Sequence, residues 1–150
     1  GKVADSNMLK RLMQEVSKLR GAQLAADLLH WGVAAGIKLE AFHYNIVITT
    51  WGKCDGAKEA LEIFNEMQSR KQPAPNVFTY NILLSVLARN KNYQAAMDLF
   101  DQMKSDGLVA DVYTFGSLMS ACAQSGRLDR AMEVLDEMHS AGVEPDTIAY

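Results

Sequence analysis

The sequence contains few of the residues that mark several classes of protein. Only two cysteines occur among its 150 residues. Cys54 and Cys122 lie in apolar helical patterns, and we therefore expect buried, reduced thiols and no disulfide framework. Three prolines and ten glycines argue against a disordered chain. No apolar run of about 18 residues is present, so the sequence predicts no membrane span.

Sequence signatures of catalysis are also missing. The chain has no Gly-rich phosphate loop, no CxxC pair, no metal-ligand cluster, and no Ser-His or Cys-His pairing at a spacing that suggests catalysis. The acidic pair Asp136 and Glu137 falls on a helix face that we expect to be solvated. Isolated histidines are expected to be surface or packing residues, and these are His30, His43 and His139. The sequence thus predicts no enzyme, no metal and no cofactor, and leaves open a catalytic domain elsewhere in a longer protein.

A repeat of about 35 residues runs through the chain. An aromatic residue recurs at intervals of 36, 35 and 35 residues, at Tyr44, Tyr80, Phe115 and Tyr150. An alanine recurs in phase with it at intervals of 35, 36 and 35, at Ala25, Ala60, Ala96 and Ala131. Two markers in register over three periods indicate a stacked array.

The two markers divide the chain into repeats at 6–40, 41–76, 77–111 and 112–146, followed by the start of a further repeat at 147–150. Repeat 6–40 is degenerate. The extra residue of repeat 41–76 falls in the loop between Met67 and Asn76, where insertions are best tolerated. The chain begins without Met and ends within a repeat, and we therefore expect a fragment of a longer array.

Each repeat is predicted to form two amphipathic helices. In repeat 77–111, apolar residues recur at helical spacing from Tyr80 to Leu87 and from Ala96 to Met103. Residues typical of helix ends flank them: N-caps at Asn76, Asp111 and Asp146, and left-handed C-caps at Gly36, Gly107 and Gly142. The expected fold is all-α, an α-solenoid of stacked helix-turn-helix repeats, since one such hairpin cannot bury its apolar face alone.

Charge is segregated although the net charge is only −3. The first helices, expected at 41–54, 77–91 and 112–127, contain no Asp or Glu, whereas the second helices carry the acids. The thirteenth residue of each repeat lies near the end of the first helix and is Lys18, Lys53, Arg89 or Gln124. Two explanations stay open. In the first, the first helices are buried, so they exclude acids, and each ends in a cation that complements the helix dipole. In the second, the cations form a ladder that contacts a nucleic-acid backbone.

Segments 77–111 (VFTYNILLSVLARNKNYQAAMDLFDQMKSDGLVAD) and 112–146 (VYTFGSLMSACAQSGRLDRAMEVLDEMHSAGVEPD) resemble the pentatricopeptide repeat. The shared marks are Tyr-Asn near the start, Gly126 before the second helix, an Ala-x-x-Leu/Val-Phe/Leu-x-x-Met run and a Gly-Val-x-Pro-Asp ending. The resemblance covers about residues 6–150 and is strong over 41–146. The tetratricopeptide repeat is the nearest competitor, but its Trp-Leu-Gly-Tyr pattern is absent here.

The resemblance implies binding of single-stranded RNA in mitochondria or chloroplasts, with each repeat reading one base. In the family, the reading residues are the fifth and the last of a repeat. These pairs are Asn45 with Asn76, Asn81 with Asp111, and Gly116 with Asp146. The family code implies that Asn-Asp favours U and that Asn-Asn favours C, so we expect a pyrimidine-leaning RNA.

Further roles follow from the same resemblance and from the cation ladder. The second residue of a family repeat packs against neighbouring bases, which implies stacking by Phe42, Phe78 and Tyr113, with Ile148 in the partial repeat. Lys53 and Arg89 are candidates for phosphate contacts. A structural role stays open beside RNA contact for these residues: helix capping for the predicted N-caps, and packing for the three stacking aromatics. The recurring aromatics Tyr44, Tyr80 and Phe115 are expected between helices in the core.

Some positions depart from the family pattern. Gly116 has no side chain with which to read a base, and Gln124 replaces the cation in the same repeat. Repeat 6–40 has Lys10 and Glu40 at its reading positions, and we expect it to cap the array or to read no base.

Two functions remain from this sequence. The first is a sequence-selective RNA-binding module of an organellar RNA-processing, stabilisation or translation factor, with the chloroplast favoured over the mitochondrion. The second is a protein-interaction solenoid, within an organellar ribonucleoprotein or transcription complex, that reads little RNA directly. Asn81 with Asp111 favours the first function, and Gly116 with the degenerate first repeat favours the second. The sequence does not predict an oligomeric state.

Overall fold

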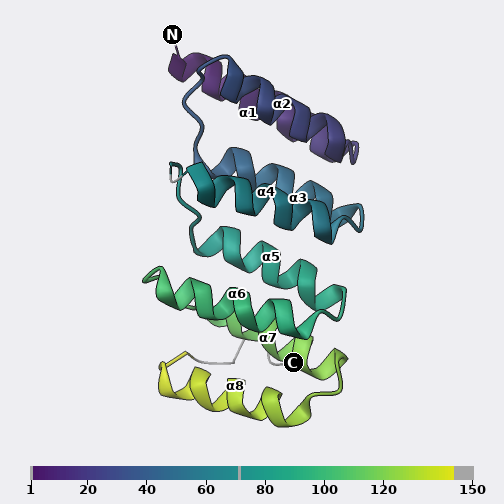
Figure 1. Ribbon diagram of the computed structural model, residues 1–150, viewed down its shortest axis with the longest axis vertical. Helices are drawn as coiled ribbons and strands as arrows, with labels where there is room; N and C mark the ends of the chain where they lie inside the picture. The colour runs from purple at the N-terminus through teal and green to yellow at the C-terminus, as the bar shows by residue number, and fades with distance from the viewer. Residues whose placement is uncertain (1, 71, 144–150) are drawn as a thin grey trace. The chain divides into compact units, whose positions relative to one another are not determined.

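The computed structural model describes residues 2–70 and 72–143, with side chains described from Ser6 onward (Figure 1). In this part of the chain the secondary structure consists of eight α-helices, without strands. They are α1 (Lys2–Lys18), α2 (Ala22–Ala34), α3 (Ala41–Lys53), α4 (Ala57–Arg70), α5 (Val77–Arg89), α6 (Tyr93–Ser105), α7 (Val112–Gln124) and α8 (Leu128–Ser140). The predicted all-α repeat fold is confirmed, including a helix over the β-branched run of α3. The repeat boundaries themselves stay a prediction from the sequence.

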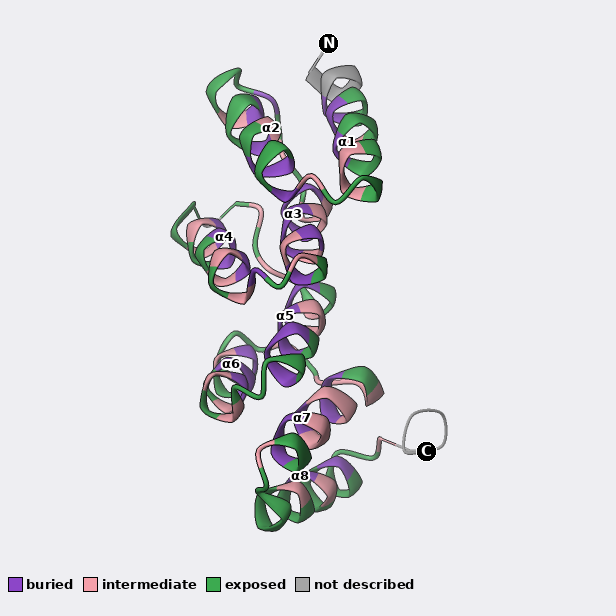
Figure 2. Cartoon of the chain, turned by 90° about the vertical axis from the view of Figure 1, so that its right-hand side faces the viewer, coloured by how far each residue is buried: buried purple, intermediate pink, exposed green. Residues whose placement is uncertain are grey.

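The helices group into two compact units, unit 1 (Gly1–Pro75) and unit 2 (Asn76–Tyr150). In unit 1, α1 packs against α2 and α3, and α3 packs against α2 and α4. In unit 2, α5 packs against α6 and α7, and α7 packs against α6 and α8. Within each unit the first helices of successive hairpins are therefore direct neighbours, and their buried sides face the rest of the unit (Figure 2).

The recurring aromatics of the described residues occupy the core as predicted. The Tyr44, Tyr80 and Phe115 side chains are at most 2% exposed. Alanines of the second marker are fully buried at Ala25, Ala60 and Ala96, where a methyl group lets two helices approach closely. In unit 2, the Phe100 ring meets the edge of the Phe115 ring with 5.8 Å between centroids, which fixes α6 against α7.

Residues with a left-handed backbone conformation follow the ends of the helices. The predicted C-cap glycines are confirmed, with φ of +76° to +78° at Gly36, Gly107 and Gly142. The turn inside each hairpin also contains a left-handed residue, at Arg20, Asp55, Lys91 and Gly126, with φ between +57° and +73°. The backbone N–H that follows Lys91, at Asn92, donates to the Leu87 carbonyl at 2.9 Å and closes the last turn of α5. Three of these four residues are not glycine, and their left-handed conformation was not predicted from the sequence.

The two thiols differ in environment. Cys122 is fully buried, as predicted, and burial raises its pKa. The prediction of burial is wrong for Cys54, which is only half-buried because it lies one residue beyond α3, in the hairpin turn. Its Sγ–H donates to the Arg20 carbonyl at 3.4 Å.

No helix in the described ranges combines the length and apolarity that crossing a bilayer would require.

Candidate nucleic-acid interface

Asp111 and Thr114 close the N-terminus of α7. The Asp111 carboxylate accepts a hydrogen bond from the Thr114 backbone N–H at 3.0 Å, and the Thr114 hydroxyl accepts from the Asp111 N–H at 3.2 Å. Asn76 and Thr79 form the same reciprocal box at the start of α5, with distances of 3.0 and 3.2 Å. The predicted N-caps are therefore confirmed at both positions, and the loop insertion leaves the Asn76 cap intact. Asp146, the third predicted cap, lies outside the described residues.

Asn81 joins the Asp111 cap from the neighbouring helix. Its Nδ2 atom donates to Asp111 Oδ1 at 3.1 Å, and its Oδ1 atom accepts from the Thr114 hydroxyl at 2.5 Å. The fifth residue of repeat 77–111 thus contacts the last residue of the same repeat, across the packed helices α5 and α7. Because the amide is held at both ends, its rotamer is fixed within the folded unit.

Asn81, Asp111 and Thr114 form a cluster in which some polar atoms take no part in the internal hydrogen bonds. A side-chain amide has two N–H donors and two lone pairs, and the cluster uses one of each from Asn81. Asp111 Oδ2 makes no hydrogen bond to the described residues. Asn81 and Asp111 are both half-buried, so one side of the pair is open to solvent. The pair therefore offers a donor, a neutral acceptor and a charged acceptor at one place.

The described structure does not test the other two predicted reading pairs. Asn45 is buried in α3 of unit 1, with 6% of its surface exposed, whereas Asn76 is exposed at the start of unit 2. Their pairing stays a prediction. Gly116 is half-buried in α7, and its predicted partner Asp146 lies outside the described residues, so that pairing also stays a prediction.

Two of the three predicted stacking aromatics are exposed. Phe78 and Tyr113 are the second residues of the neighbouring helices α5 and α7, and each has 63% of its surface in solvent. Phe42 is only half-buried and already has partners, because the His43 ring lies 4.3 Å away and Lys10 Nζ lies 4.4 Å from its centroid. Exposed rings at Phe78 and Tyr113 provide apolar faces of the kind on which bases stack. Ile148 lies outside the described residues.

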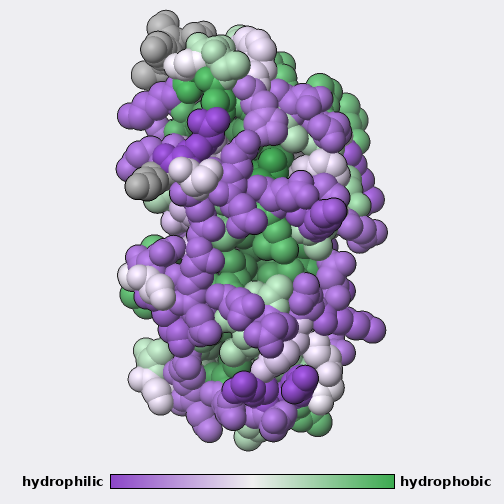
Figure 3. Space-filling model, viewed as in Figure 1, coloured by the Kyte–Doolittle hydropathy of each residue, from purple (hydrophilic) through white to green (hydrophobic). Residues whose placement is uncertain are grey.

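The predicted phosphate-contacting cations are solvent-exposed. Lys53 and Arg89 lie in the last turns of α3 and α5, and neither forms an ion pair with a described residue. By contrast, cations of unit 2's second helices pair with acids, with 3.5 Å between Lys104 and Glu137 and 2.8 Å between Arg130 and Glu133. Hydrophilic side chains predominate over α4 and α6 (Figure 3). Both explanations of the cation ladder stay open, since each cation also complements a helix C-terminus.

His43 has a structural role that the sequence analysis missed. It is fully buried, its Nδ1 accepts from the Glu40 N–H at 2.9 Å, and its Nε2 donates to the Ser6 carbonyl at 3.1 Å. Burial lowers the pKa of His43. The signal in the sequence was its place as third residue of the repeat, where Thr79 and Thr114 stand in the capping boxes. His30 is exposed, as predicted for a surface histidine, and its Nε2 lies 3.0 Å from Glu66.

Within the described ranges, no three His, Cys, Asp or Glu side chains lie close enough together to hold a metal ion.

Comparison with known proteins places the repeats in a family. The model of the PPR repeat family matches residues 40–89, 75–124 and 111–150. The chain belongs to the pentatricopeptide repeat family. A mitochondrial pentatricopeptide repeat-containing protein of Arabidopsis thaliana is 31% identical over 85 residues, which are 53% of this chain and 13% of that protein. A mitochondrial 15S rRNA processing factor of Vanderwaltozyma polyspora is 28% identical over 74 residues, which are 49% of this chain and 8% of that protein.

Solved pentatricopeptide structures share the fold. The maize protein PPR10 superposes with a TM-score of 0.82 and 19% identity, covering 93% of this chain and 20% of that one. The PPR domain of protein-only RNase P 1 from Arabidopsis thaliana, solved in complex with tRNA, gives 0.77 at 23% identity, covering 93% of this chain and 73% of that one. PPR10 has also been solved in complex with an 18-nucleotide RNA element. At these identities the likeness establishes the helical-repeat fold of this chain.

Proposed function

We propose that this chain is the RNA-binding part of an organellar RNA-processing, stabilisation or translation factor and that each intact repeat reads about one base. The observation that carries the proposal is the contact of Asn81 with Asp111, since it orders a donor and two acceptors on a partly exposed surface. Family membership, the rRNA processing factor among the relatives and the RNA-bound PPR structures support it. The repeat divisions 6–40, 41–76, 77–111 and 112–146 are part of this proposal.

The chemistry of the pair favours a pyrimidine. The unused N–H and lone pair of Asn81 can donate to a ring carbonyl and accept from the N3–H of uracil or the N4 amino group of cytosine. Phe78 and Tyr113 would stack on bases, a contact worth roughly 1–3 kcal/mol per base. Lys53 and Arg89 would meet phosphates. Gly116 contributes no side chain to its repeat, so base selection is expected to concentrate on Asn81 and Asp111.

The cellular setting is an organelle, because relatives are named mitochondrial or chloroplastic. The preference for the chloroplast over the mitochondrion is part of this proposal. We assign binding and no reaction to these repeats, since the residues with a proposed role bind and orient a base and none is placed as a nucleophile or a proton donor.

Titration with short single-stranded RNAs tests the proposal. We expect U-rich and C/U RNA to bind more tightly than oligo(A). Raising the salt from about 50 to 200 mM should weaken binding about sevenfold if two phosphates are contacted. Asn81→Ala should weaken binding to U-rich RNA about fivefold or more. Asn65→Ala, at an exposed asparagine of α4, is the matched control and should have no effect.

The protein-interaction solenoid is the alternative outcome. If U-rich RNA does not bind at low salt, even to a version of the protein that includes further repeats, the RNA-binding proposal is wrong.

A further inference from the structure

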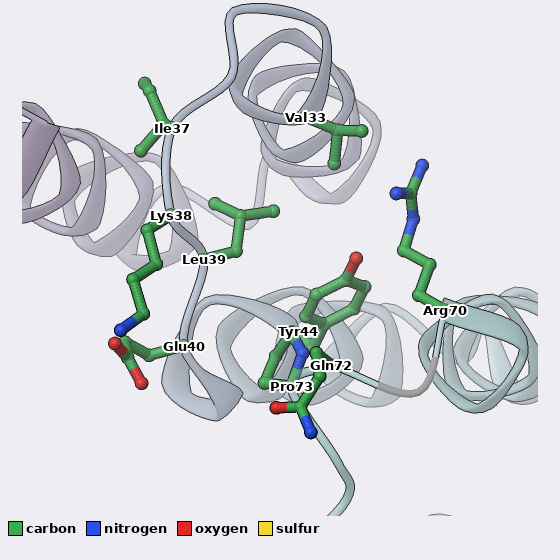
Figure 4. A pocket seen from close by; sticks show the side chains of 9 residues that line it. All are labelled: Val33, Ile37, Lys38, Leu39, Glu40, Tyr44, Arg70, Gln72 and Pro73. Carbon is green, nitrogen blue, oxygen red and sulfur yellow. The ribbon is translucent and has the colours of Figure 1, made fainter.

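Unit 1 contains a cavity of about 400 Å³ between the end of α2, the start of α3 and the end of α4 (Figure 4). Its apolar lining comes from Val33, Ile37, Leu39 and Pro73. This volume lies within the range of pockets that hold small molecules. Arg70 is exposed at its edge, so the cavity can be reached from solvent.

A buried hydroxyl points into this cavity. The Tyr44 side chain is fully buried, and its hydroxyl points toward the space between Val33 and Arg70 (Figure 4). Tyr44 Oη has no hydrogen-bond partner among the described residues. Burial raises the pKa of Tyr44, while Arg70 lowers it and Glu66 raises it, and the phenol therefore stays a proton donor near neutral pH. A buried donor of this kind needs an acceptor.

The equivalent tyrosine of the next repeat has a carboxylate partner. The Tyr80 hydroxyl donates to Asp106 Oδ2 at 2.5 Å, and the two residues are 26 positions apart. The residue 26 positions after Tyr44 is Arg70. A guanidinium has five N–H donors and no acceptor, so Arg70 cannot replace Asp106 as a partner for a phenol.

The remaining repeats support this coupling between the two positions. Phe115 has no hydroxyl, and the residue 26 positions later is Ala141. Leu9 likewise precedes Ala35 by 26 positions. In the two repeats where the first of these positions is a tyrosine, the residue 26 positions later is charged. In the two repeats where the first position has no hydroxyl, the residue 26 positions later is alanine. Repeat 41–76 alone combines a hydroxyl with a cation.

We propose that this cavity binds a small monocarboxylate with a short apolar body, whose carboxylate accepts a hydrogen bond from Tyr44 and pairs with Arg70. The bound carboxylate takes the role that Asp106 has beside Tyr80, and the apolar body contacts Val33 and Leu39. Arginine favours carboxylates because its planar N–H groups match the two oxygens. Glu40 and Lys38 lie together across the cavity from Arg70 (Figure 4), and because their opposite charges offset each other, that end offers no net attraction for a second carboxylate. This proposal is independent of RNA binding.

Benzoate is a suitable probe, with benzyl alcohol and inorganic phosphate as matched controls for the apolar body and for the anionic charge. Isothermal titration calorimetry on the whole chain is expected to give saturable binding of benzoate, with a dissociation constant on the order of 1 mM. At about ten times that concentration the melting temperature should rise by about 3 °C. Benzyl alcohol and phosphate should bind at least tenfold more weakly. If benzoate acts no differently from sodium chloride of equal ionic strength, the proposal is wrong.

Two substitutions test the assignment of residues. Arg70→Asp supplies the carboxylate from within the chain, and is expected to raise the melting temperature and to reduce benzoate affinity at least tenfold. Tyr44→Phe should reduce the affinity about tenfold, since it removes the donor and keeps the ring. Tyr80→Phe, in unit 2, is the control and should leave benzoate binding unchanged. Unaltered binding by Arg70→Asp, or loss of binding by Tyr80→Phe, would overturn the assignment.

Discussion

Asn81 and Asp111 are joined by a hydrogen bond of 3.1 Å although 30 positions separate them in the sequence. Both also contact Thr114, whose backbone N–H is capped by Asp111. The cap of one helix and the proposed base-reading pair of the preceding repeat are therefore one network. Because the amide and the carboxylate are ordered by folding, less side-chain entropy is lost when a ligand binds them.

Substitution of Asp111 should separate the cap from the reading role. Asp111→Asn keeps an oxygen that accepts from the Thr114 N–H, so the free energy of unfolding should change by less than about 0.5 kcal/mol. Base preference is expected to move from U towards C. Asp111→Ala removes the cap and should destabilise the protein by about 1–2 kcal/mol. Urea unfolding and RNA titration measure the two effects, and equal losses of stability in both variants would contradict the shared role.

The buried imidazole of His43 should make stability depend on pH. Burial holds its pKa below the ordinary value of 6.5, an effect that hydrogen bonds to Ser6 and Glu40 and the charge of Glu40 oppose and the charge of Lys10 reinforces. As the pH falls below about 6.5, the unfolded chain takes up a proton before the folded chain does. The free energy of unfolding should therefore fall until the pH passes the folded-state pKa.

Unfolding in urea at pH 7.5 and 5.5 checks this expectation. His43→Thr, which introduces the residue found at the same position of the next two repeats, should be less sensitive to pH than the unmodified protein. His139→Thr, at an exposed site of α8, serves as the control and should keep the original sensitivity. The explanation fails if both variants lose stability equally on acidification.

The turns between paired helices offer a test of backbone strain. Lys91 has φ of +57° and Gly126, at the same position of the next repeat, has φ of +73°. A residue with a Cβ atom is less stable than glycine in a left-handed conformation. Glycine loses more conformational entropy on folding, which offsets part of this difference. Lys91→Gly should therefore stabilise unit 2 by about 0.5–1 kcal/mol, and Gly126→Lys should destabilise it by a similar amount. Thermal or urea unfolding measures the stability of both variants. Destabilisation by Lys91→Gly would contradict the prediction and would show that the Lys91 side chain stabilises the turn.

The two thiols should differ in reactivity. Cys122 is fully buried with a raised pKa, whereas Cys54 is half-buried at the end of α3. Because the thiolate is the reactive form, iodoacetamide should label Cys54 at least tenfold faster than Cys122 in the folded protein. Mass spectrometry after timed labelling measures the two rates, which should converge in urea. Equal rates without denaturant would mean that α7 opens readily.

Periodicity was sufficient to predict the helices, the core aromatics and those caps that lie within the described residues. These features depend on residues that recur every 35 or 36 positions, and each repeat supplies an independent copy of the signal. The Thr114 contact with Asn81 was missed because threonine at the third position also suits an ordinary capping box. Half-burial of Cys54 was missed because it depends on where α3 ends, and helix ends are the least certain part of a sequence pattern.

The cavity beside Tyr44 could not be predicted from local pattern. Its walls come from two segments, 33–44 and 70–73, that are distant in the sequence. Its defining feature is a mismatch between two positions that the repeat otherwise couples. Such a mismatch becomes visible only when the Tyr80 contact with Asp106 is known.

The box formed by Asp111 and Thr114 limits how the repeats can be exchanged between proteins. A junction placed between Asp111 and Val112 would join a proposed base-reading residue to a foreign helix whose third residue need not be threonine. A transplanted segment that begins before Asn81 and continues through Thr114 would carry the whole network with it. For chimeras of this protein, the natural unit of exchange is therefore a repeat together with the first turn of its successor.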